Sequence, residues 1–521
     1  MSGSALLRSG AIVGAMTLIS RLLGFSRDLV FANIFGAGAA TDAFFVAFKI
    51  PNFLRRLFAE GAFSQAFIPV LAEERQKLGD AGVRRLVAAT VGTLGVILLI
   101  ITLLAVVGAE GLIYLFAPGF HGEAEKFTLA TEMLRITFPY LFFISLTALA
   151  AAILNSYGRF AIPALTPIWL NLVLIGAALG FTAHFQPPIM ALAWGVLVAG
   201  VVQLLFQLPS LYGLGLLPRP RWGWRDSGVR KILRLMLPAI FGSSVAQINL
   251  LLDTVIASFL ISGSVSWLYY SDRLVEFPLG LFGIALATVI LPALSRHHAA
   301  ADPETYSATL DWGLRWVMVT GVPAAIGLAL LATPILTTLF QYGAFAADDV
   351  AMSSLSLMAY AFGLPAFMLV KVLAPGFYAR QDTRTPVRFG VIAMVANMGL
   401  NLLFVLTIIA AGWQGAHAGL ALATVCSASL NAFLLYRHLR REGILILGEG
   451  WRLFLLRLLV GNVAMAATIL YLDHGAGFWL EASLMQRGTQ LLLEITAAAA
   501  AYFFTLWLLR MPLTMLSARR L

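Results

Sequence analysis

The stretch GAIVGAMTLISRLLGFSRDLVFANIF, Gly10–Phe35, decides how this chain must fold. It is almost entirely apolar, and it is long enough to cross a bilayer, because about 20 helical residues span the hydrocarbon core. Yet it contains Arg21, Arg27 and Asp28. An ionised side chain at membrane depth costs roughly 2.5–3.5 kcal/mol on insertion scales, so it persists where it faces a polar cavity or a partner. The stretch therefore predicts a membrane helix whose charges have a function.

The composition extends this interpretation to the whole chain. Of the 521 residues, 60% are hydrophobic and 12% are charged, against about 45–50% and about 25% in soluble proteins. An all-α polytopic membrane protein is the expected fold class. A cleaved signal peptide is the alternative for the N-terminus, but charged residues follow the first apolar run where a small-residue cleavage site should stand. The single cysteine, Cys426, excludes an intrachain disulfide.

About fourteen apolar segments have the length that a spanning helix needs. They lie near residues 10–35, 40–70, 86–116, 129–154, 161–183, 188–212, 230–261, 265–295, 312–341, 350–379, 385–411, 415–437, 452–472 and 488–511. Alternate connectors are rich in arginine, whereas the others hold little beyond Lys126 and Arg487. Because basic residues gather in cytoplasmic loops, both termini are expected in the cytoplasm. This bias also explains the net charge of +10 without a nucleic-acid partner.

A faint internal repeat predicts the domain organisation. RDLVFANIFGAGAATDAFF at 27–45 resembles LDTVIASFLISGSVSWLYY at 252–270; chance similarity between apolar segments is the alternative. Two pseudo-repeated six-helix lobes are expected, with an architecture used by alternating-access transporters. We predict an N-lobe at 1–225, a C-lobe at 226–445 and two additional helices at 446–521.

The charges within the first, second and eighth segments are the candidate substrate-binding residues. Residues 21–60 hold five cationic and three acidic side chains, and arginine outnumbers lysine. The planar arginine fork suits bidentate binding of phosphate, so a cationic pocket for an anionic group is expected. Ion pairing that only holds helices together is the alternative for any one residue. The candidates are Arg21, Arg27, Asp28, Asp42, Arg55, Arg56, Glu60, Asp272, Arg273 and Glu276.

A weaker set of oxygen-bearing residues suggests a coupling cation. Asp253, Asn397, Asn401 and Thr424 carry the ligands that a hard cation such as Na⁺ would use. Hydrogen bonding between helices is the competing interpretation. Lys371 is a further charge within an apolar segment, with no partner evident in the sequence.

Motifs of enzymatic chemistry are absent from the sequence. None of the five lysines follows a glycine, which excludes a Walker A loop, and no HExxH occurs. We therefore predict no catalytic residues and no cofactor beyond a coupling cation, Na⁺ or H⁺, or the membrane potential. A membrane glycosyltransferase would need an acidic metal site and usually a sizeable loop domain, and the sequence indicates neither.

Four stretches carry a resemblance to a known family. They are SRLLGFSRD, FGAGAATDAFFVAFKIPNFLRRLFAEGAFSQAFIPVLAE, SGSVSWLYYSDRLVEFPLGLFGIALATVILP and VKVLAPGFYARQDTRTPV. The chain strongly resembles the MurJ (MviN) lipid II flippases of the multidrug/oligosaccharidyl-lipid/polysaccharide exporter superfamily, and the match covers essentially its whole length.

The resemblance implies translocation of an undecaprenyl-pyrophosphate-linked disaccharide–pentapeptide across the bacterial inner membrane. It implies a cationic cavity between two lobes and a groove for the lipid tail formed by segments thirteen and fourteen. The family's essential arginines fall on Arg21, Arg27, Arg55 and Arg273, and its acidic cavity positions fall on Asp42 and Glu276. Asn401 stands where some members have an acid.

Three further expectations complete the interpretation from sequence. The partners expected are lipid II and membrane lipid, with other cell-wall synthesis proteins as candidates. A flippase for another polyprenyl-linked glycan would use the same chemistry. A cation-coupled drug exporter of the superfamily is a second alternative, which the positive first lobe disfavours.

Overall fold

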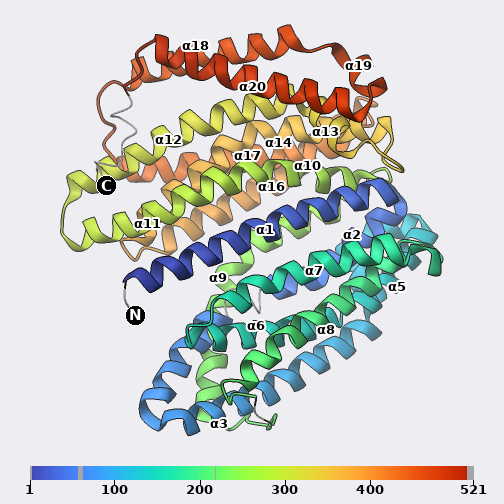
Figure 1. The fold of residues 1–521 in the computed structure, drawn as a ribbon, viewed down its shortest axis with the longest axis vertical. Coiled ribbons are helices and arrows are strands. Elements are labelled where there is room, and N and C mark those ends of the chain that lie inside the picture. The colour runs from blue at the N-terminus through green and yellow to red at the C-terminus, as the bar shows by residue number, and fades with distance from the viewer. Residues whose placement is uncertain (1–2, 57–62, 218, 513–521) are drawn as a thin grey trace. The chain divides into compact units, whose positions relative to one another are not determined.

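The structure, a computed structural model, describes residues 3–56, 63–217 and 219–512 (Figure 1). Every regular element in these ranges is a helix. The chain divides into two compact units, residues 1–265 and 266–521. The expected fold class, an all-α polytopic membrane protein, is confirmed.

The described residues of the first unit form nine α-helices before the division. They are α1 (Gly3–Phe35), α2 (Ala39–Arg55), α3 (Phe63–Val107), α4 (Ala109–Phe116), α5 (Ala124–Thr137), α6 (Tyr140–Ser156), α7 (Ala161–Gly180), α8 (Met190–Tyr212) and α9 (Ser227–Ala257). Two short 3₁₀ turns, η2 (Pro118–Gly122) and η3 (Thr182–His184), join them. The long α3 consists of two helices that meet at Gly79, whose φ of 60° favours glycine.

Within the first unit, α1 packs along α7, α2 along α5, and α9 along α3, while α8 contacts both α6 and α7. A core of buried apolar side chains gathers between α3, α6 and α9, including Phe67, Leu86 and Ile153. Gly200 on α8 allows close approach to α6, because a Cβ there would lie 2.8 Å from the Tyr140 ring. Small residues at such contacts are typical of membrane helix packing.

The second unit contains the remaining helices, the first of which begins just before the division. They are α10 (Ser264–Pro278), α11 (Ile284–Ala299), α12 (Pro303–Leu330), α13 (Ala332–Phe340), α14 (Ala347–Leu373), α15 (Pro375–Tyr378), α16 (Arg384–Ala410), α17 (Ala416–Arg441), α18 (Trp451–Leu472), α19 (Gly475–Glu481) and α20 (Leu484–Leu508). A π-helical turn, η4 (Leu279–Gly283), joins α10 to α11.

Two packed groups make up the second unit. The helices α12, α14, α17 and α16 pack side by side in that order, and α18 lies beside α20 (Figure 1). A core that includes Phe454, Trp479 and Tyr502 fills the space between α18, α19 and α20 and reaches α12. The Tyr502 hydroxyl donates to the Val319 carbonyl oxygen at 2.9 Å, which ties α20 to α12.

Eleven helical stretches of the described ranges are long and apolar enough to cross a membrane. They match eleven of the predicted segments. The other three, 10–35, 40–70 and 230–261, include residues or side chains that the structure does not describe. The count of fourteen therefore stays a prediction.

The helix pairings repeat between the two units. Contacts of α3 with α6, α6 with α8 and α7 with α8 have counterparts in α12 with α14, α14 with α17 and α16 with α17. When the predicted segments are counted from the start of each six-helix repeat, both sets are the third segment with the fourth, the fourth with the sixth, and the fifth with the sixth. This agreement supports the internal repeat, while the predicted lobe boundaries at 225 and 445 stay a prediction.

Candidate functional site

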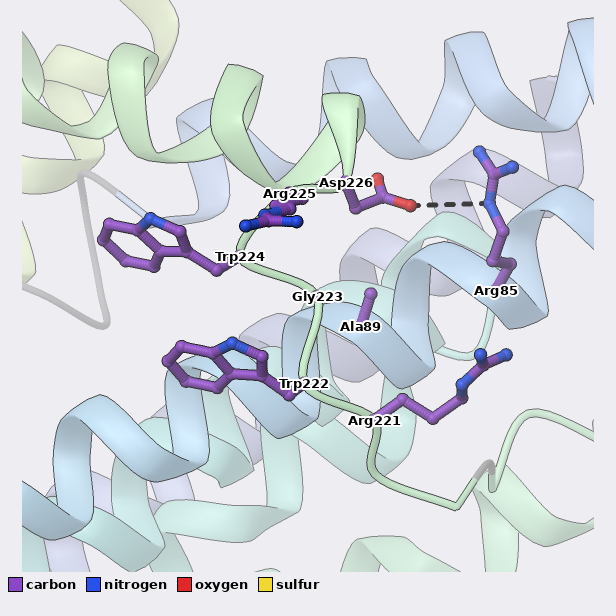
Figure 2. Close-up of a pocket in the computed structure, with 8 residues that line it drawn as sticks. All are labelled: Arg85, Ala89, Arg221, Trp222, Gly223, Trp224, Arg225 and Asp226. Carbon is purple, nitrogen blue, oxygen red and sulfur yellow. Dashed lines mark ion pairs between the residues drawn. The ribbon is translucent and has the colours of Figure 1, made fainter.

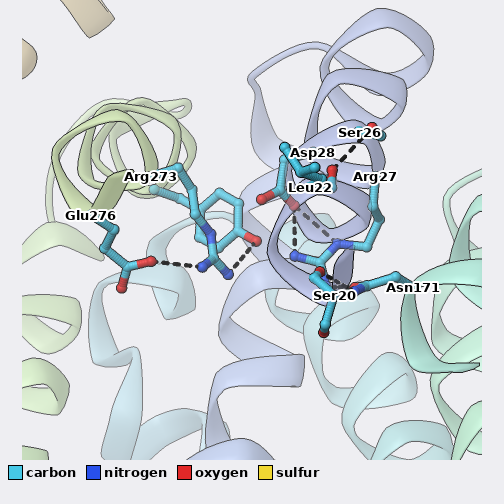
Figure 3. Close-up of polar contacts among 9 residues, drawn as sticks. Ser20, Leu22, Ser26, Arg27, Asp28, Asn171, Arg273 and Glu276 are labelled. Carbon is cyan, nitrogen blue, oxygen red and sulfur yellow. Dashed lines mark hydrogen bonds and ion pairs between the residues drawn. The ribbon is translucent and has the colours of Figure 1, made fainter. Parts of the chain in front are cut away.

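A buried ion pair on α1 lies within the apolar stretch Gly10–Phe35. Arg27 donates to Asp28 Oδ1 from Nε at 3.0 Å and from Nη2 at 2.6 Å (Figure 3). Its Nη1 donates to Asn171 Oδ1 on α7 at 3.1 Å, and Asn171 in turn donates to the Ser20 carbonyl oxygen. Arg27 is 5% exposed and Asp28 is 1% exposed. Geometry and burial therefore fix the Arg27 guanidinium in place.

Arg21 lies on the same helix in a different environment. Its side chain is exposed, and within the described residues it makes no hydrogen bond or ion pair. Gly24, between the two arginines, faces Asn171, since a Cβ there would lie 3.6 Å from Asn171 Nδ2. The structure thus distinguishes two arginines that the sequence had grouped together.

Asp42 belongs to a second buried pair. Lys126 of α5 contacts Asp42 Oδ2 at 3.2 Å, and the two side chains are 2% and 1% exposed. The backbone N–H of Gly263 donates to the same oxygen at 2.7 Å, and Lys126 also donates to Ser262 at 2.8 Å. The sequence predicts Lys126 in a connector, whereas the structure places it in α5. These contacts join α2 and α5 to residues 262–263, which lie in the connector between α9 and α10.

The remaining cationic candidates of the second predicted segment lie near the end of α2. Arg55 donates from Nε to Asn52 Oδ1 at 2.8 Å, and Arg56 is half-buried at the C-cap. On the preceding turns Lys49 donates to Thr254 Oγ1 of α9 at 2.6 Å. Glu60 lies outside the described residues.

The candidates of the eighth segment lie on α10 in the second unit. Arg273 Nη1 donates to Glu276 at 2.8 Å and Nη2 to the Tyr269 hydroxyl at 3.1 Å, with the guanidinium 5.0 Å from the Tyr269 ring centroid (Figure 3). The side chains of Arg273 and Glu276 are 35% and 50% exposed. Asp272 is also exposed. Because solvent reaches the Arg273–Glu276 pair, these side chains can exchange partners more easily than the buried Arg27–Asp28 pair on α1.

The four cation-ligand candidates are divided between the units. Asn397 and Asn401 are fully buried on α16, and α16 packs against α17, which carries Thr424. The Thr424 hydroxyl donates to the Leu420 carbonyl oxygen at 3.0 Å. Asp253 is half-buried on α9, in the first unit. Among described residues, no group of three or more His, Cys, Asp or Glu side chains could hold a metal ion.

The described residues also contain buried polar clusters that the sequence does not predict, and two of them tie helices of the second unit together. Asp311 accepts from Arg315 Nε at 2.8 Å and from Trp451 Nε1 at 2.6 Å, and the Arg315 guanidinium lies 4.8 Å from the Trp451 ring centroid. The cluster ties α12 to the start of α18. The sequence feature that could have predicted this cluster is the spacing of Asp311 and Arg315, which are four residues apart and so lie on one helical face.

The second cluster involves Arg487, which the sequence placed in a sparsely charged connector. It is 6% exposed and donates to the carbonyl oxygens of Leu480 and Thr337 at 2.8 and 3.3 Å. It therefore holds α20 against α13. Lys371, in contrast, is exposed on α14 with no hydrogen bond or ion pair among the described residues.

Comparison with known proteins identifies the family. The family model described as "Lipid II flippase MurJ" matches residues 31–487. A probable lipid II flippase MurJ of Vibrio cholerae serotype O1 is 51% identical over 520 residues, covering 98% of each chain. The lipid II flippase MurJ of Burkholderia cenocepacia is 42% identical over 510 residues, covering 97% of each.

Solved structures agree with this result. A structure titled "Lipid II flippase MurJ, inward closed conformation" has a TM-score of 0.79 and 26% identity, covering 95% of this chain and all of that one. An inward-facing MATE-family transporter of the MOP superfamily shares the fold, with a TM-score of 0.66, 15% identity and coverage of 83% and 98%. The chain therefore belongs to the lipid II flippase MurJ family.

Proposed function

We propose that this chain moves lipid II from the cytoplasmic to the periplasmic leaflet of the bacterial inner membrane. Membership of the family supports the substrate, since relatives that match nearly the whole chain are named lipid II flippases. One structural observation carries the proposed site. The exposed guanidinium of Arg21 has no partner within the described residues, on the same helix as the buried and paired Arg27.

In this proposal the two arginines have different roles. Arg21 binds the lipid diphosphate, because an exposed guanidinium can offer its fork of donors to a phosphate without first breaking a bond. Arg27 is a positioning residue: its bonds to Asp28 and Asn171 hold α1 against α7 and fix the direction in which α1 presents Arg21. Asp28 neutralises the charge of Arg27 and so limits the cationic excess.

The other candidates contribute electrostatically. Arg273 would leave Glu276 and bind the diphosphate when the headgroup enters, since an exposed pair costs little to exchange. Arg55 and Arg56 add positive charge, and Glu60, Asp272 and Glu276 moderate it. Asp42, paired with Lys126, would keep α2 and α5 in register around the cavity rather than contact lipid II.

The proposed mechanism is alternating access. The headgroup enters an inward-open cavity between the lobes, the prenyl chain stays in lipid along α18 and α20, and rocking of the lobes releases the headgroup outside, with both termini in the cytoplasm. A cationic cavity would respond to the membrane potential, since one charge crossing the field gains about 2.3 kcal/mol per 100 mV. Na⁺ at Asp253, Asn397, Asn401 and Thr424, or H⁺, is the alternative coupling.

The proposal is tested by depleting the protein in cells that have no other lipid II flippase and measuring lipid II accessible at the outer leaflet. We expect outward lipid II to fall while total lipid II rises. Re-expression of the wild-type chain should restore the outward pool. An unchanged outward pool would contradict the function.

The same assay separates the alternatives. If outward lipid II is unchanged but another polyprenyl-linked glycan accumulates inside, the chain flips that glycan. A drug exporter would instead change the sensitivity of cells to cationic compounds without affecting either lipid. The acids that a cationic drug would require are paired at Asp28 and Asp42 in the first unit, which disfavours this activity.

A further inference from the structure

The connector between α8 and α9 forms a pocket of about 620 Å³ against α3 (Figure 2). Its lining is unusually basic and aromatic: Arg221, Trp222, Trp224 and Arg225 come from the connector, and Arg85 comes from α3. None of these residues belongs to the site proposed for lipid II. The pocket lies wholly within the first unit.

The pocket is built on a connector that is held in place. The backbone N–H of Arg221 donates to the Ala88 carbonyl oxygen at 3.0 Å, and that of Gly223 donates to Thr93 Oγ1 at 3.0 Å. The approach to α3 is so close that a Cβ on Gly223 would lie 2.4 Å from Ala89 Cβ. A Cβ on Gly92 of α3 would likewise lie 2.2 Å from the Arg221 carbonyl oxygen. The backbone at Arg221 and Gly223 is therefore held close against α3.

The charges of the pocket leave two cations available. Asp226 caps α9 by accepting from the N–H of Gly228 at 2.9 Å, and it also lies 3.5 Å from Arg85. Arg85 also forms an ion pair with Glu74, at 3.6 Å. The side chains of Arg221 and Arg225 are exposed and make no hydrogen bond or ion pair within the described ranges. The one acid of the lining is thus already engaged, and the pocket attracts anions.

The two tryptophans indicate where in the membrane this anion would lie. Their rings are stacked, 6.1 Å apart with planes at 9°, and they are 61% and 48% exposed (Figure 2). They lie in the connector, ten and twelve residues beyond Tyr212, the last residue of α8, which is apolar and long enough to span the membrane. Exposed tryptophans in a connector that follows a spanning helix are typical of the headgroup level. The available arginines therefore face the layer that contains lipid phosphates.

We propose that this pocket binds the phosphate headgroup of an anionic bilayer phospholipid, as a site separate from that of the transported lipid. Arg221 and Arg225 bind the phosphate, and Trp222 and Trp224 pack on the glycerol and upper acyl region. The basic connectors predict the cytoplasmic leaflet, whose anionic lipids attract arginine.

The test is native mass spectrometry of the full chain in a non-ionic detergent, titrated with phosphatidylglycerol. We compare wild type with Arg221→Gln/Arg225→Gln. The matched control is Arg384→Gln/Arg388→Gln, which removes two exposed arginines at the start of α16. We expect the pocket variant to bind the first phosphatidylglycerol about 30-fold more weakly, from the usual contribution of two arginines near anionic lipid, and the control to match wild type. Phosphatidylcholine should bind wild type as weakly as phosphatidylglycerol binds the pocket variant.

Three results would overturn the proposal. Unchanged phosphatidylglycerol binding by the pocket variant would exclude the site, and equal weakening in the control would show a general charge effect. Displacement of the bound lipid by inorganic phosphate at equal concentration would assign the pocket to a soluble anion. If the double variant is not monodisperse, Arg225→Gln alone gives the same test with an expected effect of about fivefold.

Discussion

Asn171 on α7 accepts a hydrogen bond at 3.1 Å from Arg27 on α1, although the two residues are 144 positions apart in the chain. The bond joins the two helices at the level of the Arg27–Asp28 pair. Asn171 is itself nearly buried and donates back to the Ser20 carbonyl oxygen of α1. The charged stretch of the first helix is therefore a structural junction as well as a candidate site.

The first prediction concerns the Arg27–Asp28 pair. Asp28→Asn should destabilise the protein by about 3–5 kcal/mol, because it leaves the buried guanidinium of Arg27 without its counter-charge. The double variant Arg27→Gln/Asp28→Asn should be more stable than Asp28→Asn, since neither charge then remains buried alone. Unfolding followed in detergent measures both. A double variant less stable than the single one would contradict the pairing.

The Asp42–Lys126 pair gives a prediction that separates stability from transport. Asp42→Asn should destabilise the protein, because the buried Lys126 ammonium then keeps only the longer ion pair, 3.7 Å from the half-exposed Glu123, and Asp42→Asn/Lys126→Gln should recover most of the loss. If Asp42 only keeps α2 and α5 in register, the double variant should also recover transport of lipid II. Restored stability without restored transport would instead assign Asp42 a direct role.

Trp451 connects the start of α18 to α12 through its hydrogen bond to Asp311, so loss of this bond should lower the stability of the protein. Trp451→Phe keeps an aromatic ring against Arg315 but removes the donor to Asp311. Since a hydrogen bond to a charged group contributes about 1.5–3 kcal/mol, we expect a loss of stability of that size. Trp224→Phe serves as the control, because this exposed indole makes no side-chain hydrogen bond within the described residues. Equal effects of the two substitutions would argue against the anchor.

Because α8 packs closely against α6, replacing Gly200 by alanine should destabilise the protein more than replacing Gly176 by alanine. Gly200→Ala should cost about 1–3 kcal/mol, because the new methyl group would meet the Tyr140 ring at 2.8 Å. Gly176→Ala on α7 meets nothing within 4 Å and should be neutral or slightly stabilising, since alanine favours helix. Thermal unfolding of both variants in one detergent makes the comparison. Equal stability of the two would show that α6 and α8 are less tightly packed than described.

Much of the architecture could be predicted from the sequence because a bilayer demands long apolar helices. Eleven predicted segments correspond to helices with that length and apolarity. Boundaries were less predictable where helices continue past the hydrocarbon core, as α3 does from Phe63 to Val107. Gly79 then interrupts the helix in a place that periodicity does not reveal.

The candidate site was less predictable, because the sequence gives the charges but not their partners. Arg21 and Arg27 have the same chemistry and neighbouring positions, yet one is exposed and the other is buried against Asp28. The partner of Asp42 comes from a region that had been assigned to a connector. Pairing between distant residues depends on helix packing, which the pattern of a single segment does not contain.

The most direct test of the account is the binding of lipid II to purified protein carrying Arg21→Ala. The account predicts a loss of affinity with unchanged thermal stability, because the exposed Arg21 side chain makes no contact that holds the fold together within the described residues. Arg21→Lys should retain part of the affinity, and Arg84→Ala, which removes an exposed arginine of α3, should retain all of it. Wild-type affinity in Arg21→Ala would contradict the central claim that this guanidinium binds the lipid diphosphate.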